Sequence, residues 1–118
     1  MMPSLTYLIA GHIRYRPSSP ERDWQYLRFV RTFPCVVCHT SRWIEAAHVG
    51  PHGLGQKASD TQSIPLCPKH HRTGPEALHI LGPVKFQEKH QLDINALVTM
   101  FQHFYAEKLE ASAATAMR

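Results

Sequence analysis

Apolar residues recur at helical spacing near the start of the chain, where Trp24, Leu27 and Val30 follow one another at intervals of three. This period places the three side chains along one side of a helix and predicts a helix over residues 20–32. A serine–proline pair at its start is typical of a helix N-terminus. Pro34 ends the helix, because the residue before a proline avoids helical backbone angles.

The end of the chain carries a second, longer apolar stripe. It begins after Asp93, a residue type that caps helices, and it predicts a helix over about residues 93–112. We interpret this stripe as core packing rather than as a binding groove. A short helix is expected near Pro83, and the final residues, 111–118, are expected to fray. The stripe consists of Ile94, Leu97, Val98, Phe101, Phe104 and Tyr105.

Between these helices the composition is that of short strands and turns. One strand is expected around Trp43–Ile44, and a second in the segment TQSIPLC, beyond a glycine-rich loop. A helix is expected to begin after Pro68 and to be interrupted early. These elements predict a single small α+β domain over residues 19–118, preceded by an arm of residues 1–18.

Length and composition restrict the class of protein. The chain has 118 residues, which suits one compact domain, and its hydrophobic fraction of 43% is ordinary for a soluble protein. No apolar run approaches the roughly 18 residues that a membrane span needs. The N-terminal stretch lacks the order of parts found in a signal peptide. We therefore expect a cytoplasmic protein with no membrane partner.

The positive charge is concentrated in the first part of the chain. The net charge is +4, and residues 1–44 hold six arginines against two acidic residues. Such an excess favours a polyanionic partner, most often nucleic acid, although a solvated basic surface explains it equally well. The candidates for contacts with a phosphate backbone are Lys57 in the glycine-rich loop and five arginines: Arg14, Arg16, Arg28, Arg31 and Arg42.

The three cysteines favour a metal site. An odd number argues against a closed disulfide framework, and clustered thiols in a reducing cytosol more often bind metal. Cys35 and Cys38 form one pair separated by two residues, and Cys67 and His70 form a second pair at the same spacing. Three sulfurs and one nitrogen suit a structural Zn²⁺. Two alternatives stay open: buried cysteines acting as small apolar residues, and His39 or His71 as the fourth ligand.

The neighbour of His70 suggests a second, catalytic site. Adjacent residues on a helix diverge by about 100°, so if His70 completes the zinc site, His71 faces elsewhere. We expect it to face the hairpin of the two strands, opposite His48, where one imidazole could hold an ion and the other activate water. The simpler alternative is that His48 is a hydrogen-bonded histidine at a strand end.

The order of these parts resembles a known enzyme family. The string "CVVC…AAHV…GLGQKASDTQSIPLCPKHH" is similar to zinc-containing HNH endonucleases of the ββα-metal, or His-Me finger, class. Within that class it is most similar to the Ref-like and YbcO-like nucleases of phages and prophages. The resemblance covers roughly residues 33–90 and leaves out the arm and the last helix.

This resemblance implies roles for individual residues. His48 matches the general base, and Gln62 falls where the family has the asparagine that orients the base. His71 matches the metal-binding histidine at the start of the helix. The second helical histidine of many relatives is here a proline, so His79 is the expected second ligand of the catalytic ion. Asp60 could supply a carboxylate or brace the loop. The position before the base, a metal-binding residue in many relatives, is an alanine.

We therefore expect a zinc-braced ββα-metal nuclease that cleaves or nicks DNA. Its catalytic divalent ion would be Mg²⁺, Mn²⁺ or Zn²⁺, and its partners would be DNA and proteins of phage replication or recombination. The alternatives are a non-catalytic zinc module that binds nucleic acid and a zinc-stabilised adaptor that binds protein.

Overall fold

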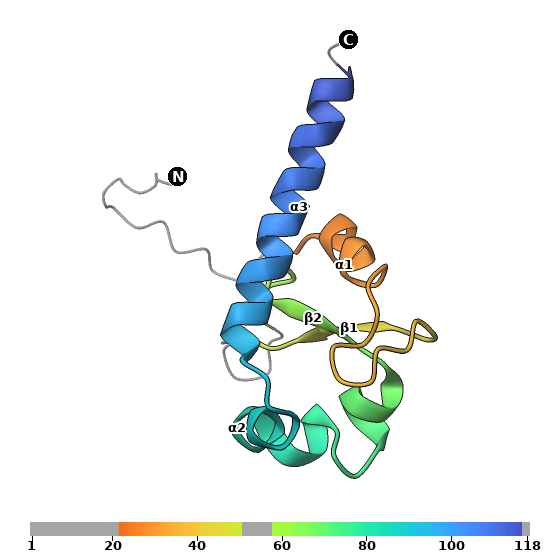
Figure 1. Cartoon of the computed structure of the whole chain (residues 1–118), viewed down its shortest axis with the longest axis vertical. Coiled ribbons are helices and arrows are strands. Elements are labelled where there is room, and N and C mark those ends of the chain that lie inside the picture. Colours follow the sequence, from red (N-terminus) through yellow and green to blue (C-terminus); the bar gives the residue numbers. More distant parts are fainter. Residues whose placement is uncertain (1–21, 51–57, 117–118) are drawn as a thin grey trace, which may run out of the picture.

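The fold is described from a computed structural model, which places residues 22–50 and 58–116. The arm of residues 1–18 and Lys57 lie outside the described residues. Figure 1 shows a long C-terminal helix, α3, running beside a short helix, α1, and a two-stranded hairpin, with α2 at the opposite end from the C-terminus. The expectation of a small α+β protein is confirmed. Within the described ranges, no helix combines the length and apolarity that crossing a membrane requires.

Helix α1 spans Trp24–Val30, which is shorter than predicted. It begins after Asp23, whose carboxylate accepts a hydrogen bond of 3.0 Å from the backbone N–H of Tyr26 and so caps the helix. Its buried face holds Tyr26, Phe29 and Val30, the i, i+3, i+4 pattern of one helix side. The predicted stripe was therefore wrong in one member, because the side chain of Trp24 is 64% exposed.

The two strands form one antiparallel hairpin. Strand β1 is Glu45–His48 and strand β2 is Ser63–Leu66, with Ala47 opposite Ile64 and His48 opposite Ser63. The first strand begins later than predicted, because Trp43 has a φ of 61° and cannot continue an extended chain.

The segment after β2 coils twice before the last helix. Cys67 is followed by one π-helical segment, η1 (Lys69–Thr73), and then by α2 (Leu78–His90). Helix α2 consists of two pieces joined at Gly82, whose φ of 81° suits glycine, and the second piece starts at Pro83 as predicted.

Helix α3 spans Ile94–Ala116, and the predicted cap is present: Asp93 Oδ1 accepts a hydrogen bond of 3.0 Å from Ala96 N–H. Ile94 and Phe101 are buried, and Leu97, Val98 and Tyr105 pack against the apolar clusters, which confirms the core-packing interpretation for these five. Phe104, the sixth member, is 36% exposed. The expectation that the chain frays from residue 111 was wrong for residues 111–116, which continue helix α3. The last turns are rich in alanine, which has the highest helix propensity.

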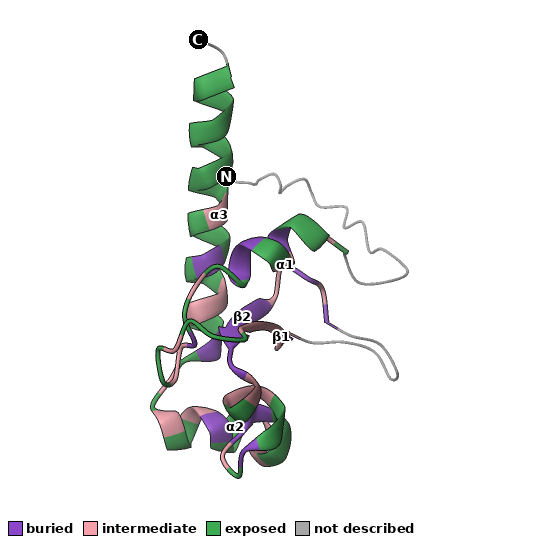
Figure 2. Ribbon diagram, turned by 90° about the vertical axis from the view of Figure 1, so that its right-hand side faces the viewer, coloured by how far each residue is buried: buried purple, intermediate pink, exposed green. Residues whose placement is uncertain are grey.

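Two apolar clusters hold these elements together. The larger one joins the inner side of the hairpin to α2 and the start of α3, around Ile64, Leu66 and Phe86. The smaller one is aromatic and joins α1 to α3, where the ring of Tyr105 lies 5.0 Å from those of Tyr26 and Phe29. Figure 2 shows the far half of α3 exposed. The larger cluster therefore packs on one face of the hairpin, and the aromatic cluster packs on the other.

Candidate functional site

The first half of a metal cluster lies in the turn between α1 and β1. Cys35 N–H donates to the carbonyl of Thr40, and His39 N–H donates to the carbonyl of Cys35, both at 2.9 Å. Val37 N–H also points at Cys35 Sγ, 3.4 Å away. His39 has a φ of 64°, a left-handed angle that turns the chain back on itself after Cys38. The turn thereby presents both thiols to one side.

The second half comes from the start of η1. The backbone N–H groups of His70 and His71 both donate to the carbonyl of Cys67, at 3.1 and 2.8 Å. This tight coil places Cys67 and His70, three residues apart, on the same side. His70 therefore turns toward the cysteines, while His71 points away from them.

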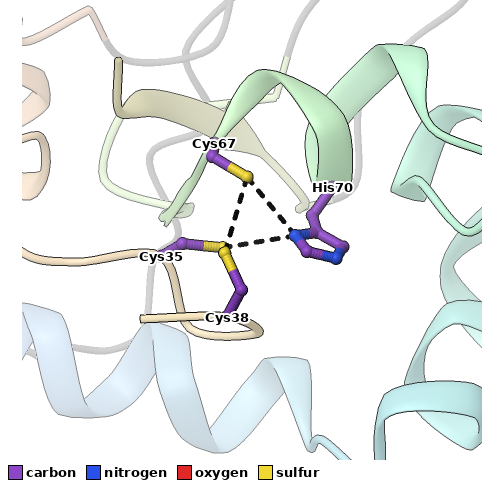
Figure 3. A group of neighbouring side chains, drawn as sticks. All are labelled: Cys35, Cys38, Cys67 and His70. Atoms are coloured by element: carbon purple, nitrogen blue, oxygen red, sulfur yellow. Dashed lines mark hydrogen bonds between the residues drawn. The ribbon is translucent and has the colours of Figure 1, made fainter. Parts of the chain in front are cut away.

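The four side chains meet at distances that suit a tetrahedral ion. The Sγ atoms of Cys38 and Cys67 are 3.8 Å apart, and His70 Nδ1 lies 3.3 Å from Cys67 Sγ and 3.8 Å from Cys35 Sγ (Figure 3). Zn–S bonds of about 2.3 Å and a Zn–N bond of about 2.0 Å require S···S edges near 3.8 Å and S···N edges of about 3.5 Å. The residues therefore fit a structural metal such as zinc, and the predicted four come together.

The surroundings of His70 favour the neutral imidazole that metal binding needs. Burial, followed by the charges of His90 and Lys69, lowers the pKa of His70, so the neutral imidazole predominates. The ring of His90 stands edge-on to that of His70 with centroids 5.6 Å apart, and its Nε2 is 2.9 Å from the carbonyl oxygen of Glu76. Helix α2 thereby supports the ligand from outside the cluster. Cys35 and Cys67 are buried, whereas Cys38 is exposed.

His48 occupies a different part of the hairpin. Its Nε2 lies 2.8 Å from Oδ1 of Asp60, a residue that is 5% exposed. Asp60 also accepts hydrogen bonds from Arg22 Nη1 at 3.0 Å and from the backbone N–H of Asp23 at 2.7 Å. Burial would raise the pKa of Asp60, but the hydrogen bonds from His48, Asp23 and Arg22 lower it overall. Asp60 is therefore an ionised acceptor, and His48 donates from Nε2.

The residue that contacts His48 is thus Asp60, not Gln62. The backbone of Gln62 extends the strand pairing, since its carbonyl accepts from Val49 N–H at 2.9 Å. Its side chain packs directly against Gly50, where an added Cβ would lie 1.5 Å from the amide oxygen. Asp60 therefore holds the imidazole where Gln62 was expected, and the Gln62 side chain lies against Gly50.

His71 has its own partners on η1 and β1. Its Nδ1 lies 2.7 Å from Glu45 Oε1, and Arg72 Nε donates to the same oxygen at 3.0 Å. Hydrogen bonds from Arg72 and then His71 lower the pKa of Glu45 to about 2. Burial lowers the pKa of His71 despite the opposing effect of Glu45. A neutral His71 that donates from Nδ1 keeps a free lone pair on Nε2. The ring of His79 stands edge-on to it, 4.7 Å between centroids.

The predicted pairing of His48 with His71 does not occur. Glu45, the partner of His71, and His48 are the two ends of β1, about 10 Å apart along the strand. Their side chains also point to opposite sides of the hairpin, because residues alternate along a strand. Ala47 packs in the larger cluster and Ala46 against the aromatic one. The two histidines are therefore separated by the hairpin. In the described part of the chain, only the Cys₃His cluster gathers three or more such ligands closely enough for one ion.

The residues expected to contact phosphate are not gathered at either histidine. Arg31 is the exposed C-terminal cap of α1, and Arg42 is exposed in the turn before β1, where its N–H donates to Thr40 Oγ1 at 3.3 Å. Sequence reasoning passed over Glu45 and Arg22. Nothing in the local pattern marks Glu45, the first residue of β1, because its partners lie 26 and 27 positions away.

Comparison with known proteins gives one match. The family model described as "Protein of unknown function (DUF968)" matches residues 16–106, which include every residue of the cluster and both histidine sites. No curated protein and no solved structure matches the chain.

Proposed function

This chain belongs to the DUF968 family. We propose, from its own residues, that it is a metal-dependent endonuclease that cleaves or nicks DNA on a zinc-braced ββα-metal core. The observation that carries the proposal is the His48–Asp60 pair, an imidazole whose side chain is 20% exposed, held by a buried carboxylate. The resemblance of the motif string to phage-type HNH nucleases supports the same reaction and a role in recombination or DNA processing.

The geometry of the pair suits general base catalysis. Because Asp60 accepts from Nε2, the other ring nitrogen of neutral His48 carries a lone pair that can take a proton from water. The negative charge of Asp60 stabilises the imidazolium that forms, and Arg22 and Asp23 hold the carboxylate in place. The activated water would then attack the phosphorus of a phosphodiester, and the 3′ oxygen would leave.

His71 and His79 are the candidates to hold the catalytic divalent ion. Glu45 accepts from Nδ1 of His71, which resembles the carboxylate–histidine pairs that orient metal-binding imidazoles in proteins. A Mg²⁺, Mn²⁺ or Zn²⁺ ion held there would supply charge neutralisation for a scissile phosphate, provided that the same phosphate also reaches His48. The Cys₃His cluster keeps a purely structural role, because all four of its positions are taken by protein atoms.

One observation favours a second candidate function. The hairpin separates His48 from His71, so the two do not share a single site in the described structure. A zinc-stabilised module that binds nucleic acid without cutting it would need no such site. It would bind DNA in any divalent ion and leave the phosphodiester intact.

A nicking assay on supercoiled plasmid separates the two candidates. The wild-type protein is expected to nick in magnesium or manganese, and His48→Ala to lose about 10²–10⁴ of the rate with zinc content and DNA affinity unchanged. His103→Ala is the matched control, because His103 is exposed on α3 with only an ion pair to Glu107. If the wild type binds DNA but does not nick it in either ion, the nuclease proposal is refuted and the non-catalytic binding module takes its place. Equal nicking by His48→Ala would remove His48 as the base.

A further inference from the structure

A groove of about 390 Å³ runs between α1 and α3, away from both histidine sites and from the Cys₃His cluster. Its walls come from both helices, which Figure 1 shows side by side. Phe29 and Tyr105 both line it, and their rings pack against each other with centroids 5.0 Å apart. The volume falls within the range of about 300–1,000 Å³ in which proteins bind small molecules.

One wall of the groove carries an exposed tryptophan. Trp24, the first residue of α1, lines the groove and is 64% exposed, whereas the other aromatic residues of this helix, Tyr26 and Phe29, are buried. A tryptophan left open to solvent beside other rings offers a flat surface on which a planar group can stack. The aromatic cluster beneath it keeps that surface in place, because Tyr26 and Phe29 anchor the same helix.

The charge of the groove is entirely positive. Arg28 from α1 and Lys108 from α3 line it, and none of its nine lining residues is acidic. Lys108 Nζ lies over the ring of Phe29, 5.5 Å from its centroid, rather than against a carboxylate. Within residues 22–50 and 58–116, neither cation forms an ion pair. Both positive charges are available to bind an anion, so an anionic ligand would complement the charge of the groove.

We propose that this groove binds one unpaired nucleotide of a DNA single strand, with the base stacked on Trp24 and the adjoining phosphate between Arg28 and Lys108. Stacking needs a base whose face is free, which a duplex does not offer, whereas every unpaired base has one. The combination of an indole surface and two cations fits a nucleotide, which joins a planar base to a phosphate, better than the acidic side chains of a peptide, which carry no ring. The choice of DNA as the polymer rests on the proposed nuclease function.

The groove is connected to the His48–Asp60 pair through α1. Asp23 N–H donates to Asp60 Oδ2 at 2.7 Å, and Trp24 is the next residue. A strand stacked on Trp24 would therefore be held by the same end of the helix that positions the proposed base. The link between the groove and the proposed base is thus the first turn of α1, through Asp23 and Asp60.

The test measures binding of fluorescein-labelled oligothymidylate by anisotropy, with the full chain and without added magnesium or manganese. Trp24→Ala is expected to weaken binding about tenfold or more, and Trp24→Phe to restore most of it. Trp43→Ala is the matched control, because Trp43 is 77% exposed but outside the groove. Unchanged zinc content and melting temperature show that the variants are folded.

A second comparison tests the phosphate contact. Arg28→Gln should reduce the slope of log affinity against log salt by about 0.7, as expected for one lost phosphate contact on a single strand. Lys85→Gln, an equal change of charge at an exposed position of α2, should leave the slope unchanged. Equal affinities for Trp24→Ala and Trp43→Ala would overturn the proposal. So would a duplex that binds as strongly as the single strand and depends equally on Trp24.

The outcomes also distinguish this inference from the nuclease proposal. Trp24-dependent binding of the single strand without cleavage leaves the groove assignment standing and removes the nuclease. Cleavage that Trp24→Ala and Arg28→Gln leave unchanged, together with unchanged binding, removes the groove assignment alone. Light scattering could show that the wild type is a dimer and that Trp24→Ala is a monomer whose DNA binding is intact. This result would assign the groove to a second copy of the chain and overturn the proposal.

Discussion

Replacement of Asp60 by asparagine tests a buried carboxylate that accepts three hydrogen bonds. Asp60 uses both oxygens: Oδ1 accepts from His48 and Arg22, and Oδ2 accepts from the backbone N–H of Asp23. Asparagine has nearly the same shape but only one acceptor oxygen. In either orientation, its NH₂ group faces at least one N–H donor, and the negative charge opposite His48 is gone.

The size of the effect follows from these contacts. Hydrogen bonds to a charged group contribute about 1.5–3 kcal/mol each. The backbone N–H of Asp23 is fixed at the start of α1, so it cannot reorient to donate to water instead. Arg22, whose side chain is 50% exposed, can be solvated instead and adds little. We expect Asp60→Asn to lower the free energy of unfolding by about 2–3 kcal/mol and the melting temperature by roughly 10–20 °C. The nicking rate should fall about 10²-fold, because the imidazolium loses its counter-charge.

The pH dependence gives the loss a distinctive signature. The folded-state pKa of Asp60 lies below its value in the unfolded chain, which is about 3.9. The stabilisation from this carboxylate is therefore fully present above pH 4 and is lost as the pH falls below it, toward the folded pKa. The difference in unfolding free energy between the wild type and Asp60→Asn should be largest near neutral pH and should shrink below about pH 4.

Urea denaturation at several pH values and plasmid nicking measure the two effects. Asp93→Asn is the matched control, because Asp93 is an exposed helix cap and asparagine caps equally well. The control should change stability by a few tenths of a kcal/mol at most. The reasoning fails if Asp60→Asn unfolds at the same urea concentration as the control, or if its deficit does not shrink in acid.

Three further predictions concern the metal cluster and the neighbouring histidine. Cys67→Ser should lose zinc and lower the melting temperature by about 10 °C or more, as measured by metal analysis and calorimetry; a zinc-free variant of unchanged stability would contradict the structural role. His70→Ala should lose zinc and stability together, whereas His71→Ala should keep both and nick only at higher manganese concentration; the reverse result would exchange the two roles. Glu45→Gln should remove a part of the stability that the wild type has above pH 4.5 and loses as the pH falls toward 2, so equal acid unfolding curves would contradict the Glu45 contacts.

Local pattern in the sequence was sufficient for several features. The ligand spacing identified Cys35, Cys38, Cys67 and His70, because each pair is brought together by a turn of three residues whose geometry is local. The cap at Asp93 and the apolar stripe after it were also predictable, since both depend on contacts within one helix. Such features need no knowledge of what packs against them.

The tertiary structure alone decided which residues surround the two histidines. Asp60 is 12 positions from His48, and Glu45 is 26 positions from His71, and no local pattern pairs residues at such separations. It also decided that Trp24 is exposed, because α1 turns Tyr26 and Phe29 toward α3. The two faces of strand β1 are distinguished only by the elements that pack against each of them. The sequence could therefore list the chemical groups, but only the packing of α1 and η1 on opposite sides of the hairpin separated them into two sites.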